Sequence, residues 1–279
     1  MITRIESVAI IGRGKVGQSL AQLATLKGYK TELIGRDQAQ QKKACKNTDL
    51  IIIAVNDEAI NTLAGQLVSA IVKPVIICQC SGALNSDELN NLQAAGALTA
   101  SCHPLNTFPT LEAALKTFSS PEHASYLFAE GDPKALPLLA RFYEDLGFSF
   151  KQIEKEAKTH YHLACTMACN YLSVLMHSSL NIAESAGLER AEFWLALSPL
   201  INKTLQNISN YGSLSSLSGP IARGDIQTTQ RHLIALNDEA TEIPQLMYRV
   251  LGKAAAKMAL ERAQLNSEEY KRIIDELED

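Results

Sequence analysis

Three glycines near the start of the chain have the spacing of a loop that binds nucleotide phosphates. They form the pattern Gly-x-Gly-x-x-Gly between an apolar segment and the start of a helix, which is the setting that gives the pattern its meaning. The first glycine permits a tight turn, the second lets a pyrophosphate approach the backbone, and the third lets the helix pack closely. The alternative is a glycine-rich turn without a ligand. We predict that the phosphates are bound by Gly12, Arg13, Gly14, Lys15, Val16 and Gly17.

The residues after the second apolar segment indicate which dinucleotide is bound. Chains that bind NAD usually place Asp or Glu there, to bond the ribose 2′-hydroxyl. This chain has Arg36, whose guanidinium suits a 2′-phosphate, and Arg13 in the glycine loop could reach the same group. Asp37 fits either the ribose or the N-cap of the next helix, where Gln40 would complete a capping box. The pattern favours NADP(H) over NAD.

Four further residues stand where two apolar segments end. Val55 and Asn56 close the segment that starts at residue 49, and Ser81 and Gly82 follow the segment 74–80. The carboxyl ends of parallel strands line the ligand crevice of such folds. We therefore expect contacts from these residues to the nicotinamide half of the cofactor, although they could equally be turn residues.

His103 is the first candidate for proton chemistry. It follows another apolar segment, 98–102, and precedes Pro104. From the end of a strand it could donate a proton or orient a substrate carbonyl. The alternative is a structural histidine that only forms hydrogen bonds within the fold.

The start of a long helix carries the other candidates. Lys158, His162 and Thr166 are four residues apart and share one face, with Asn170 on its flank. Reduction of a carbonyl needs a hydride from NADPH and a proton on the forming alkoxide, which Lys158 or His162 can supply. Asn170 could bond the carbonyl oxygen as charge develops. The alternative is a solvated helix start, with Lys158 and His162 exposed.

A third segment, residues 217–225, has an elaborate loop composition. Gly219-Pro220 and Gly224 force a defined loop, and Asp225 is placed to cap the next helix. We predict that Ser218, Gly219 and Arg223 bind a substrate carboxylate or the cofactor phosphates. The alternative is an ordinary connection between two helices.

The elements that must position these residues divide into two groups. Up to about residue 153, short apolar segments alternate with helical ones, which predicts a doubly wound parallel sheet of the Rossmann type. From residue 154 the pattern is helical only, and Pro199 predicts a kink or break in the helix 191–210. We predict a dinucleotide-binding domain over residues 1–153 and an all-α domain for substrate binding and dimerisation over residues 154–279.

Composition excludes several other classes of protein. The net charge of −4 and the absence of a basic stripe argue against binding to nucleic acid or an anionic membrane. The first residues lack the features of a signal peptide and the apolar runs are too short to span a bilayer, so we expect a cytoplasmic location. The six cysteines include no Cys-x-x-Cys pair, and we predict no metal site.

The same residues resemble a family of predicted oxidoreductases that join a Rossmann-like domain to a helical C-terminal domain of unknown function. The resemblance covers nearly the whole chain and is most specific at residues 218–225, where Ser218 replaces the usual Thr. It rests on the glycine motif 12–17, His103-Pro104 with Phe108, Lys158 with Tyr161-His162 and Asn170, and the segment 218–225.

The resemblance implies a fold and an activity. The family is similar in architecture to ketopantoate reductase, pyrroline-5-carboxylate reductase and prephenate dehydrogenase, a 6-phosphogluconate-dehydrogenase-like arrangement. It implies reduction of 2-dehydropantoate to pantoate with NADPH, with Lys158 as general acid and Asn170 as its partner, although their spacing exceeds the short Lys-to-Asn spacing of related dehydrogenases. It also implies a homodimer through the C-terminal helices, of which 157–186 resembles the dimerising helix.

Overall fold

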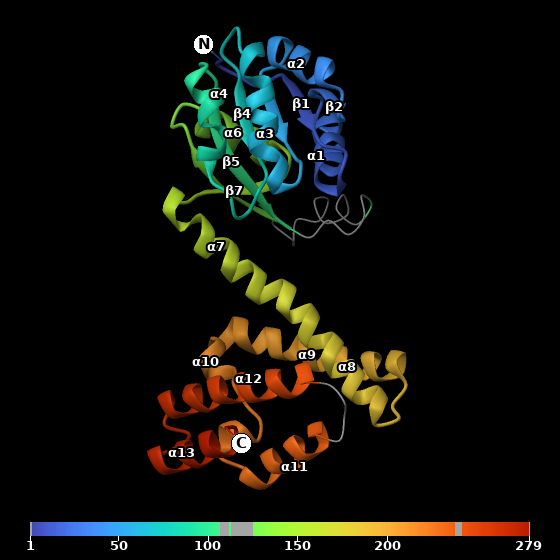
Figure 1. The fold of residues 1–279 in the computed structure, drawn as a ribbon, viewed down its shortest axis with the longest axis vertical. Coiled ribbons are helices and arrows are strands. Elements are labelled where there is room, and N and C mark those ends of the chain that lie inside the picture. The colour runs from blue at the N-terminus through green and yellow to red at the C-terminus, as the bar shows by residue number, and fades with distance from the viewer. Residues whose placement is uncertain (1, 107–111, 113–124, 238–241, 279) are drawn as a thin grey trace. The chain divides into compact units, whose positions relative to one another are not determined.

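The chain forms two compact units, residues 1–167 and 168–279. The structure is a computed structural model that describes residues 2–106, 112, 125–237 and 242–278, so Phe108 lies outside the described residues. Each unit has its own core, and each is described separately below (Figure 1).

A seven-stranded sheet forms the centre of the first unit. Its spatial order is β2-β1-β3-β4-β5-β6-β7, with the first five strands parallel and β6 antiparallel to β5. The strands are β1 (Ser7–Ile11), β2 (Lys30–Ile34), β3 (Leu50–Ile53), β4 (Ile76–Gln79), β5 (Leu98–Leu105), β6 (Ser125–Gly131) and β7 (Phe148–Gln152). The order reverses between β1 and β3, so the doubly wound Rossmann fold predicted from the sequence is confirmed.

The direction of the last two strands differs from the all-parallel sheet that the sequence predicts. β6 pairs antiparallel with β5, with His103 opposite Phe128, and β7 pairs parallel with β6 after a crossover through a helix. Apolar patterning predicts that a segment is a strand, but both directions bury such a segment equally well. The antiparallel pairing brings the first residues of β6 to the edge of the sheet where β5 ends.

Helices cover both faces of this sheet and create two separate cores. α1 (Lys15–Leu26) and α6 (Leu136–Asp145) pack on one face. The other face is covered by α2 (Gln38–Asn47), α3 (Asp57–Leu67) and α4 (Asn90–Ala94), with short 3₁₀ turns at Val68–Ala70 and Ser86–Leu89. Because the central strand β3 is covered on both sides, it is fully buried along its length, as its unbroken apolar sequence predicts.

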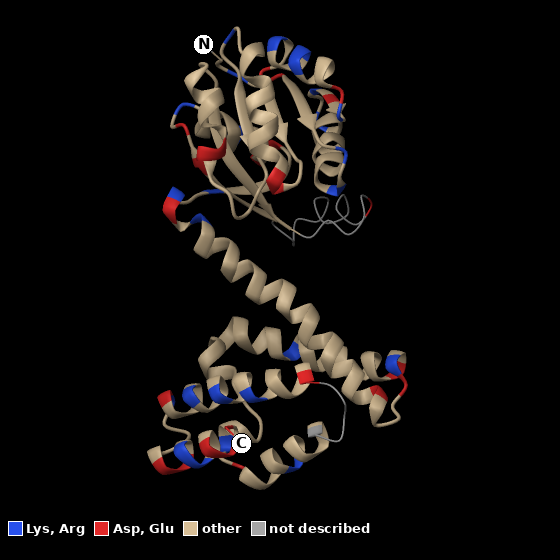
Figure 2. Ribbon diagram, viewed as in Figure 1, with Lys and Arg blue, Asp and Glu red and all other residues tan. Residues whose placement is uncertain are grey.

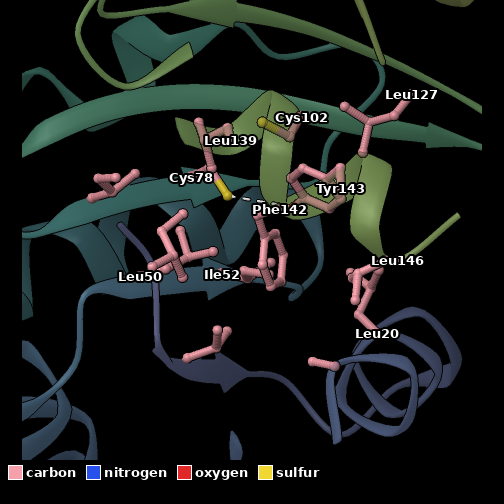
Figure 3. Close-up of a cluster of buried hydrophobic side chains, with 14 of the residues drawn as sticks. Leu20, Leu50, Ile52, Cys78, Cys102, Leu127, Leu139, Phe142, Tyr143 and Leu146 are labelled. Carbon is pink, nitrogen blue, oxygen red and sulfur yellow. Dashed lines mark hydrogen bonds between the residues drawn. The ribbon is translucent and has the colours of Figure 1, made fainter. Parts of the chain in front are cut away.

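The core on the α1 and α6 side is rich in aromatic and sulfur-containing side chains (Figure 3). Phe142 and Tyr143 meet edge to face with ring centroids 5.0 Å apart, and Leu50 and Ile52 belong to the same cluster. The buried Tyr143 hydroxyl lies 3.6 Å from the Cys78 sulfur, which gives this polar group a partner inside an apolar cluster. Tight packing here fixes the strands that carry the candidate site.

The second unit contains only helices among its described residues. α7 (Lys158–Cys165), at the end of the first unit, is followed by a π-helical turn (Thr166–Asn170). The helices that follow are α8 (Tyr171–Ser185), α9 (Arg190–Tyr211), the short α10 (Ser213–Ser216), α11 (Ile226–Asn237), α12 (Glu242–Glu261) and α13 (Ser267–Glu276). Ile221, Ala256 and Ile273 lie in the small core of this unit. None of the described helices is long and apolar enough to cross a lipid bilayer.

Of the kink or break predicted at Pro199, the break does not occur, because α9 continues through this residue from Arg190 to Tyr211. Proline removes one backbone donor from the helix, while the hydrogen bonds on either side of it remain available. The preceding helix α8 ends at Ser185, and Gly187 follows it with a φ of 83°.

We expect the core around β3 to determine the stability of the first unit. Ile52 is fully buried, so Ile52→Ala should lower the free energy of unfolding of this unit by about 2–5 kcal/mol. Leu26→Ala is a suitable control because Leu26 is 69% exposed, and its effect should stay within about 0.5 kcal/mol. Amide hydrogen exchange of the strand peptides under increasing urea measures both. An equal loss in the two variants would contradict this account of the core.

Candidate functional site

A cleft of about 830 Å³ lies at the carboxyl ends of β1, β2 and β3. Backbone and side chains from the glycine loop, the end of β2 and the start of α3 form its walls. Its lining includes Gly12, Arg13, Gly14, Arg36, Val55 and Asn56. The structure therefore brings six of the predicted cofactor residues to one cleft.

The glycine loop has the geometry that a bound pyrophosphate requires. Gly12 has a φ of 129°, and a β-carbon there would collide with the Ala54 carbonyl group. A β-carbon at Gly14 would have no atom within 4 Å, so the space beside it is open to a ligand. No side chain caps α1 at Gly14, which leaves the N–H groups of its first turn free for an anion.

The predicted loop residues Lys15, Val16 and Gly17 do not line the cleft. Lys15 is exposed at the first position of α1, and Val16 packs against the core on the α1 side. A β-carbon at Gly17 would collide with the Gly12 carbonyl, so this glycine permits the close approach of helix and loop. These residues can contact phosphate through first-turn N–H groups rather than through side chains.

Two arginines frame the part of the cleft beyond β2. Arg13 lies over Gly35, where a β-carbon would stand 3.3 Å from its Nε atom, and Arg36 follows directly. Within the described residues, no carboxylate lies at ion-pair distance from either guanidinium. Asp37 is the N-cap of α2, because its side chain accepts hydrogen bonds from the N–H groups of Ala39 and Gln40. Its side chain is thus already used within the fold, while both arginines are free to bind an anion.

A tight turn after β4 carries Ser81 and Gly82 to the same edge of the sheet. The Ser81 hydroxyl donates to Asp57 Oδ2 at 2.8 Å and accepts from the N–H groups of Ala83 and Leu84. Ser81 does not line the dinucleotide cleft, so its predicted contact with the nicotinamide has no support from the lining of the cleft. A β-carbon at Gly82 would collide with the His162 ring and lie 3.0 Å from His103 Nε2. The absence of a side chain at Gly82 lets both histidines approach the turn.

Lys158 is the most unusual residue of this group. Its side chain is 1% exposed, and its Nζ atom donates a hydrogen bond to the Ser81 carbonyl oxygen at 2.9 Å. Burial lowers the pKa of Lys158 below its ordinary value, and the nearby acidic groups only partly oppose this effect. The solvated helix start is therefore ruled out for Lys158, whose ammonium group is enclosed beside the strand ends.

His103, His162 and Tyr161 surround the same turn. The His103 and His162 rings lie 5.9 Å apart, and His103 Nδ1 is 2.9 Å from the Tyr161 hydroxyl. Burial, with added repulsion from Lys158 and His162, lowers the pKa of His103 to about 4. His103 is consequently neutral at neutral pH and can orient a ligand, but it carries no imidazolium proton to give.

The remaining predicted residues belong to the second unit. Asn170 is exposed in the π-helical turn. Gly219 has a φ of 108°, Ser218 and Arg223 are exposed, and Asp225 caps α11 by accepting from the Thr228 N–H group. The segment is thus the defined loop that the sequence predicts, and a role for it in binding the substrate carboxylate stays a prediction.

Three polar residues that hydrogen-bond the turn or the 3₁₀ segment after it escaped the sequence analysis; Gln79 and Glu130 are buried and Asp57 is exposed. Gln79 bonds the turn from inside the sheet, Asp57 bonds the Ser81 hydroxyl, and Glu130 accepts from both the N–H and the hydroxyl of Ser86 at 2.7 Å. The available signals were Gln79 at the end of the otherwise apolar β4 and the charged Glu130 next to the last residue of β6. A buried polar residue needs a hydrogen-bond partner, but the sequence pattern does not identify which residue that partner is.

Comparison with known proteins supports the fold. Residues 125–255 match the model of a domain of unknown function, DUF2520, and no curated protein matches the chain. Protein TM1727 from Thermotoga maritima is similar with a TM-score of 0.68 and 23% identity, over 92% of this chain and 99% of that one. An imine reductase from Streptomyces aurantiacus has a TM-score of 0.61 and 16% identity, over 96% and 98%. Pyrroline carboxylate reductase from Plasmodium falciparum with NADP bound has a TM-score of 0.57 and 11% identity, over 95% and 98%.

We expect His103 to make the first unit less stable in acid. Its pKa in the folded chain is about 4, below the ordinary value of 6.5, so the unfolded chain binds the proton first as the pH falls. Stability should decrease from about pH 6.5 to about pH 4, by at most about 3 kcal/mol from this group. His103→Asn should remove that part of the decrease. His160→Asn is the matched control because His160 is exposed in the same unit. Hydrogen exchange of β5 amides across this pH range measures the effect, and identical curves for His103→Asn and the unaltered protein would exclude it.

Proposed function

We propose that the protein is an NADP(H)-dependent oxidoreductase that reduces a small oxo acid, with 2-dehydropantoate (ketopantoate), reduced to pantoate, as the leading substrate. The observation that carries the proposal is the buried ammonium group of Lys158, held at the edge of the sheet where the dinucleotide cleft also opens. Strand carboxyl ends on both sides of the reversal in strand order are where such folds bind ligands. A proton donor of this kind beside a dinucleotide site suits carbonyl reduction.

The cleft fits NADP(H) better than NAD. Arg13 and Arg36 can neutralise a 2′-phosphate, and Asp37 is used as a helix cap instead of as a ribose ligand. The structurally similar pyrroline carboxylate reductase from Plasmodium falciparum binds NADP, which agrees with this choice. The open space at Gly14 and the free N–H groups of α1 would hold the pyrophosphate.

We assign different roles in the reduction to the residues at the turn. NADPH, when bound, supplies a hydride to the substrate carbonyl carbon. Lys158 then gives its proton to the developing alkoxide oxygen, and the Ser81 carbonyl holds the ammonium group in place for that transfer. The neutral His103 ring can hydrogen-bond the carbonyl oxygen and so orient it, while Tyr161 fixes the ring. The His162 ring borders the same space, 5.9 Å from the His103 ring.

The charges at the turn favour an anionic substrate. The Lys158 ammonium group carries a positive charge at the turn and His103 is neutral, while the carboxylates of Asp57 and Glu130 already accept hydrogen bonds from Ser81 and Ser86. A carboxylate beside the buried ammonium group is attracted to it, and a cationic iminium is repelled. This balance supports an oxo acid over an imine.

A second candidate is an imine reductase of the pyrroline-5-carboxylate type. The structural likeness to an imine reductase and to a pyrroline carboxylate reductase favours it. A third reading is an NADP(H)-binding regulatory protein without turnover, for which the cleft alone would suffice.

We also propose that the protein is a homodimer through its C-terminal helices. α9 carries only three charged residues, Arg190, Glu192 and Lys203, and Figure 2 shows the rest of this helix free of charge. Several large apolar side chains on it are exposed, among them Leu195 at 73%, Leu200 at 63% and Tyr211 at 68%. An apolar helix face of this kind is typical of a surface that another subunit covers.

A substrate panel separates the candidate functions. The purified protein would be given NADPH with oxo acids, including ketopantoate, and with cyclic imines, and the loss of NADPH absorbance would be recorded. Oxidation with ketopantoate and restored growth of a pantothenate-requiring strain that lacks its ketopantoate reductase are the expected results. Turnover with imines alone would favour the second candidate, and tight NADPH binding without any turnover would favour the third.

Arg36→Ala should weaken the binding of NADPH far more than that of NADH. Loss of a hydrogen bond to a charged group costs about 1.5–3 kcal/mol, which corresponds to about 10- to 100-fold in Kd for NADPH. Arg141→Ala is the control, since Arg141 is exposed on α6 outside the cleft. Calorimetry with both nucleotides measures the two constants, and an equal loss for NADPH and NADH would refute the 2′-phosphate role of Arg36.

Lys158→Met should remove turnover while leaving the cofactor site intact. Methionine fills the buried space without a proton to donate, so kcat should fall by about 10²- to 10⁴-fold. The Kd for NADPH should change by less than about twofold, because Lys158 lies outside the cleft lining. Lys151→Met, at an exposed position of β7, should behave as the unaltered protein. Unchanged turnover in Lys158→Met would remove this residue from the mechanism.

A further inference from the structure

The side chain of Gln79 is an isolated polar group at the end of a central strand. It is the last residue of β4, it is completely buried, and the other residues of the strand are Ile76, Ile77 and Cys78. A carboxamide in such surroundings is costly unless its donors and acceptor all find partners. Its partners therefore indicate what the group does there.

The partners of Gln79 lie in the turn that follows the strand. Its Oε1 atom accepts from the Ser81 N–H group, and its Nε2 atom donates to the Leu84 carbonyl at 2.8 Å and to the Ser101 hydroxyl at 2.8 Å. The Ser81 N–H can only donate and the Leu84 carbonyl can only accept, so the amide has one possible orientation. Leucine could make neither bond, and a carboxylate could not make the second.

The hydrogen bonds of Gln79 hold the turn from the strand side, and the Ser81 hydroxyl adds hydrogen bonds within the turn. That hydroxyl accepts from the N–H groups of Ala83 at 3.1 Å and Leu84 at 3.0 Å. Hydrogen bonds thus hold Ser81 at its N–H group and at its side chain. Because the residue is held at both, its carbonyl group has a fixed orientation. The Lys158 ammonium group donates to that carbonyl.

We propose that Gln79 is a positioning residue for Lys158: by fixing the turn at Ser81 and Leu84, it places the carbonyl that holds the ammonium group at the strand ends. The inference deepens the proposed function, on which it rests for its catalytic meaning. Gln79 lies outside the cleft lining and acts on Lys158 indirectly, through the Ser81 carbonyl. Ser101 of β5 supports the same arrangement, because its hydroxyl accepts from Gln79 Nε2 and donates to the Leu84 carbonyl at 3.2 Å.

The surroundings of Lys158 make its ammonium group sensitive to this carbonyl. Groups that titrate or carry charge face Lys158 from four elements and one turn. They are Asp57 of α3, Cys80 in the turn after β4, Cys102 and His103 of β5, Glu130 of β6 and His162 of α7. Burial already disfavours the charged form, and a carbonyl acceptor favours it. Displacing the carbonyl should therefore lower the pKa of Lys158 further.

The test is a direct titration of Lys158. The full chain would be labelled with ¹³C at lysine Cε, and the Lys158 signal, assigned by its loss in Lys158→Met, would be followed with pH. We expect its midpoint to fall by about one pH unit in Gln79→Leu relative to the unaltered protein. The alkaline limb of kcat should move to lower pH by the same amount, with the Kd for NADPH unchanged.

Thr48→Val is the matched control for the loss of a buried hydrogen bond. Thr48 is buried in the same unit, and its hydroxyl bonds the Ala44 carbonyl at 2.9 Å, away from the turn. It should lower stability without moving the Lys158 midpoint. If Gln79→Leu does not fold, Ser81→Ala loosens the same turn without a change of charge and should lower the midpoint in the same direction.

An unmoved Lys158 midpoint in the folded variant overturns the proposal, as does an equal shift in Thr48→Val. The titration needs no substrate, so its failure is distinct from a failure of the proposed function. Absence of turnover in the unaltered protein would reject the reductase, while a shifted midpoint would still establish Gln79 as the residue that positions Lys158.

Discussion

The enclosure of one ammonium group shapes the whole edge of the sheet. Transferring a charged amine out of water is strongly unfavourable unless nearby groups replace its hydration. Lys158 meets this requirement with a backbone carbonyl of Ser81, and no carboxylate lies within ion-pair distance of it among the described residues. A carbonyl stabilises the ammonium group without pairing it permanently, which keeps the proton available for transfer. The turn must then be rigid, because a loose turn would move that carbonyl. Gly82 must lack a side chain, because a β-carbon there would displace the two histidines beside it.

The sheet supplies the rigidity on which this arrangement depends. Parallel strands place all their carboxyl ends at one edge of the sheet. The glycine loop after β1 and the turn after β4 therefore lie at the same edge, although they are far apart in the sequence. Apolar cores on both faces hold the strands, and cores packed at crystal-like density resist small displacements. The hydrogen bonds of the buried Gln79 connect the end of β4 to the turn, so the turn is held by the rigid sheet.

Sequence patterns predicted the parts of the molecule that depend on local chemistry. The glycine loop, the buried strands and Arg36 follow from residue types in short windows, and the structure places them as expected. The burial of Lys158 did not follow, because the spacing of Lys158 and His162 gives a shared helix face without saying what covers that face. Gln79 was missed for a similar reason. Its role depends on its hydrogen bonds to Ser81 and Leu84, and the turn that places these residues beside it forms only in the folded structure. The direction of β6 and the uninterrupted α9 at Pro199 likewise depend on neighbours and not on the segments themselves.

The low dielectric that lowers the pKa of Lys158 also selects the charge of a ligand. Two charges interact several times more strongly in a partly enclosed site than in bulk water. A small oxo acid brings a carboxylate that offsets the cost of burying the ammonium group, so its binding should raise the pKa of Lys158 and keep the proton in place until the alkoxide forms. A cationic iminium would do the opposite, lowering the pKa of Lys158 and releasing its proton before reduction. With His103 held neutral by burial, no imidazolium from this residue competes for a substrate carboxylate, and the coupling of substrate charge to proton supply is a physical reason for the site to prefer an anion.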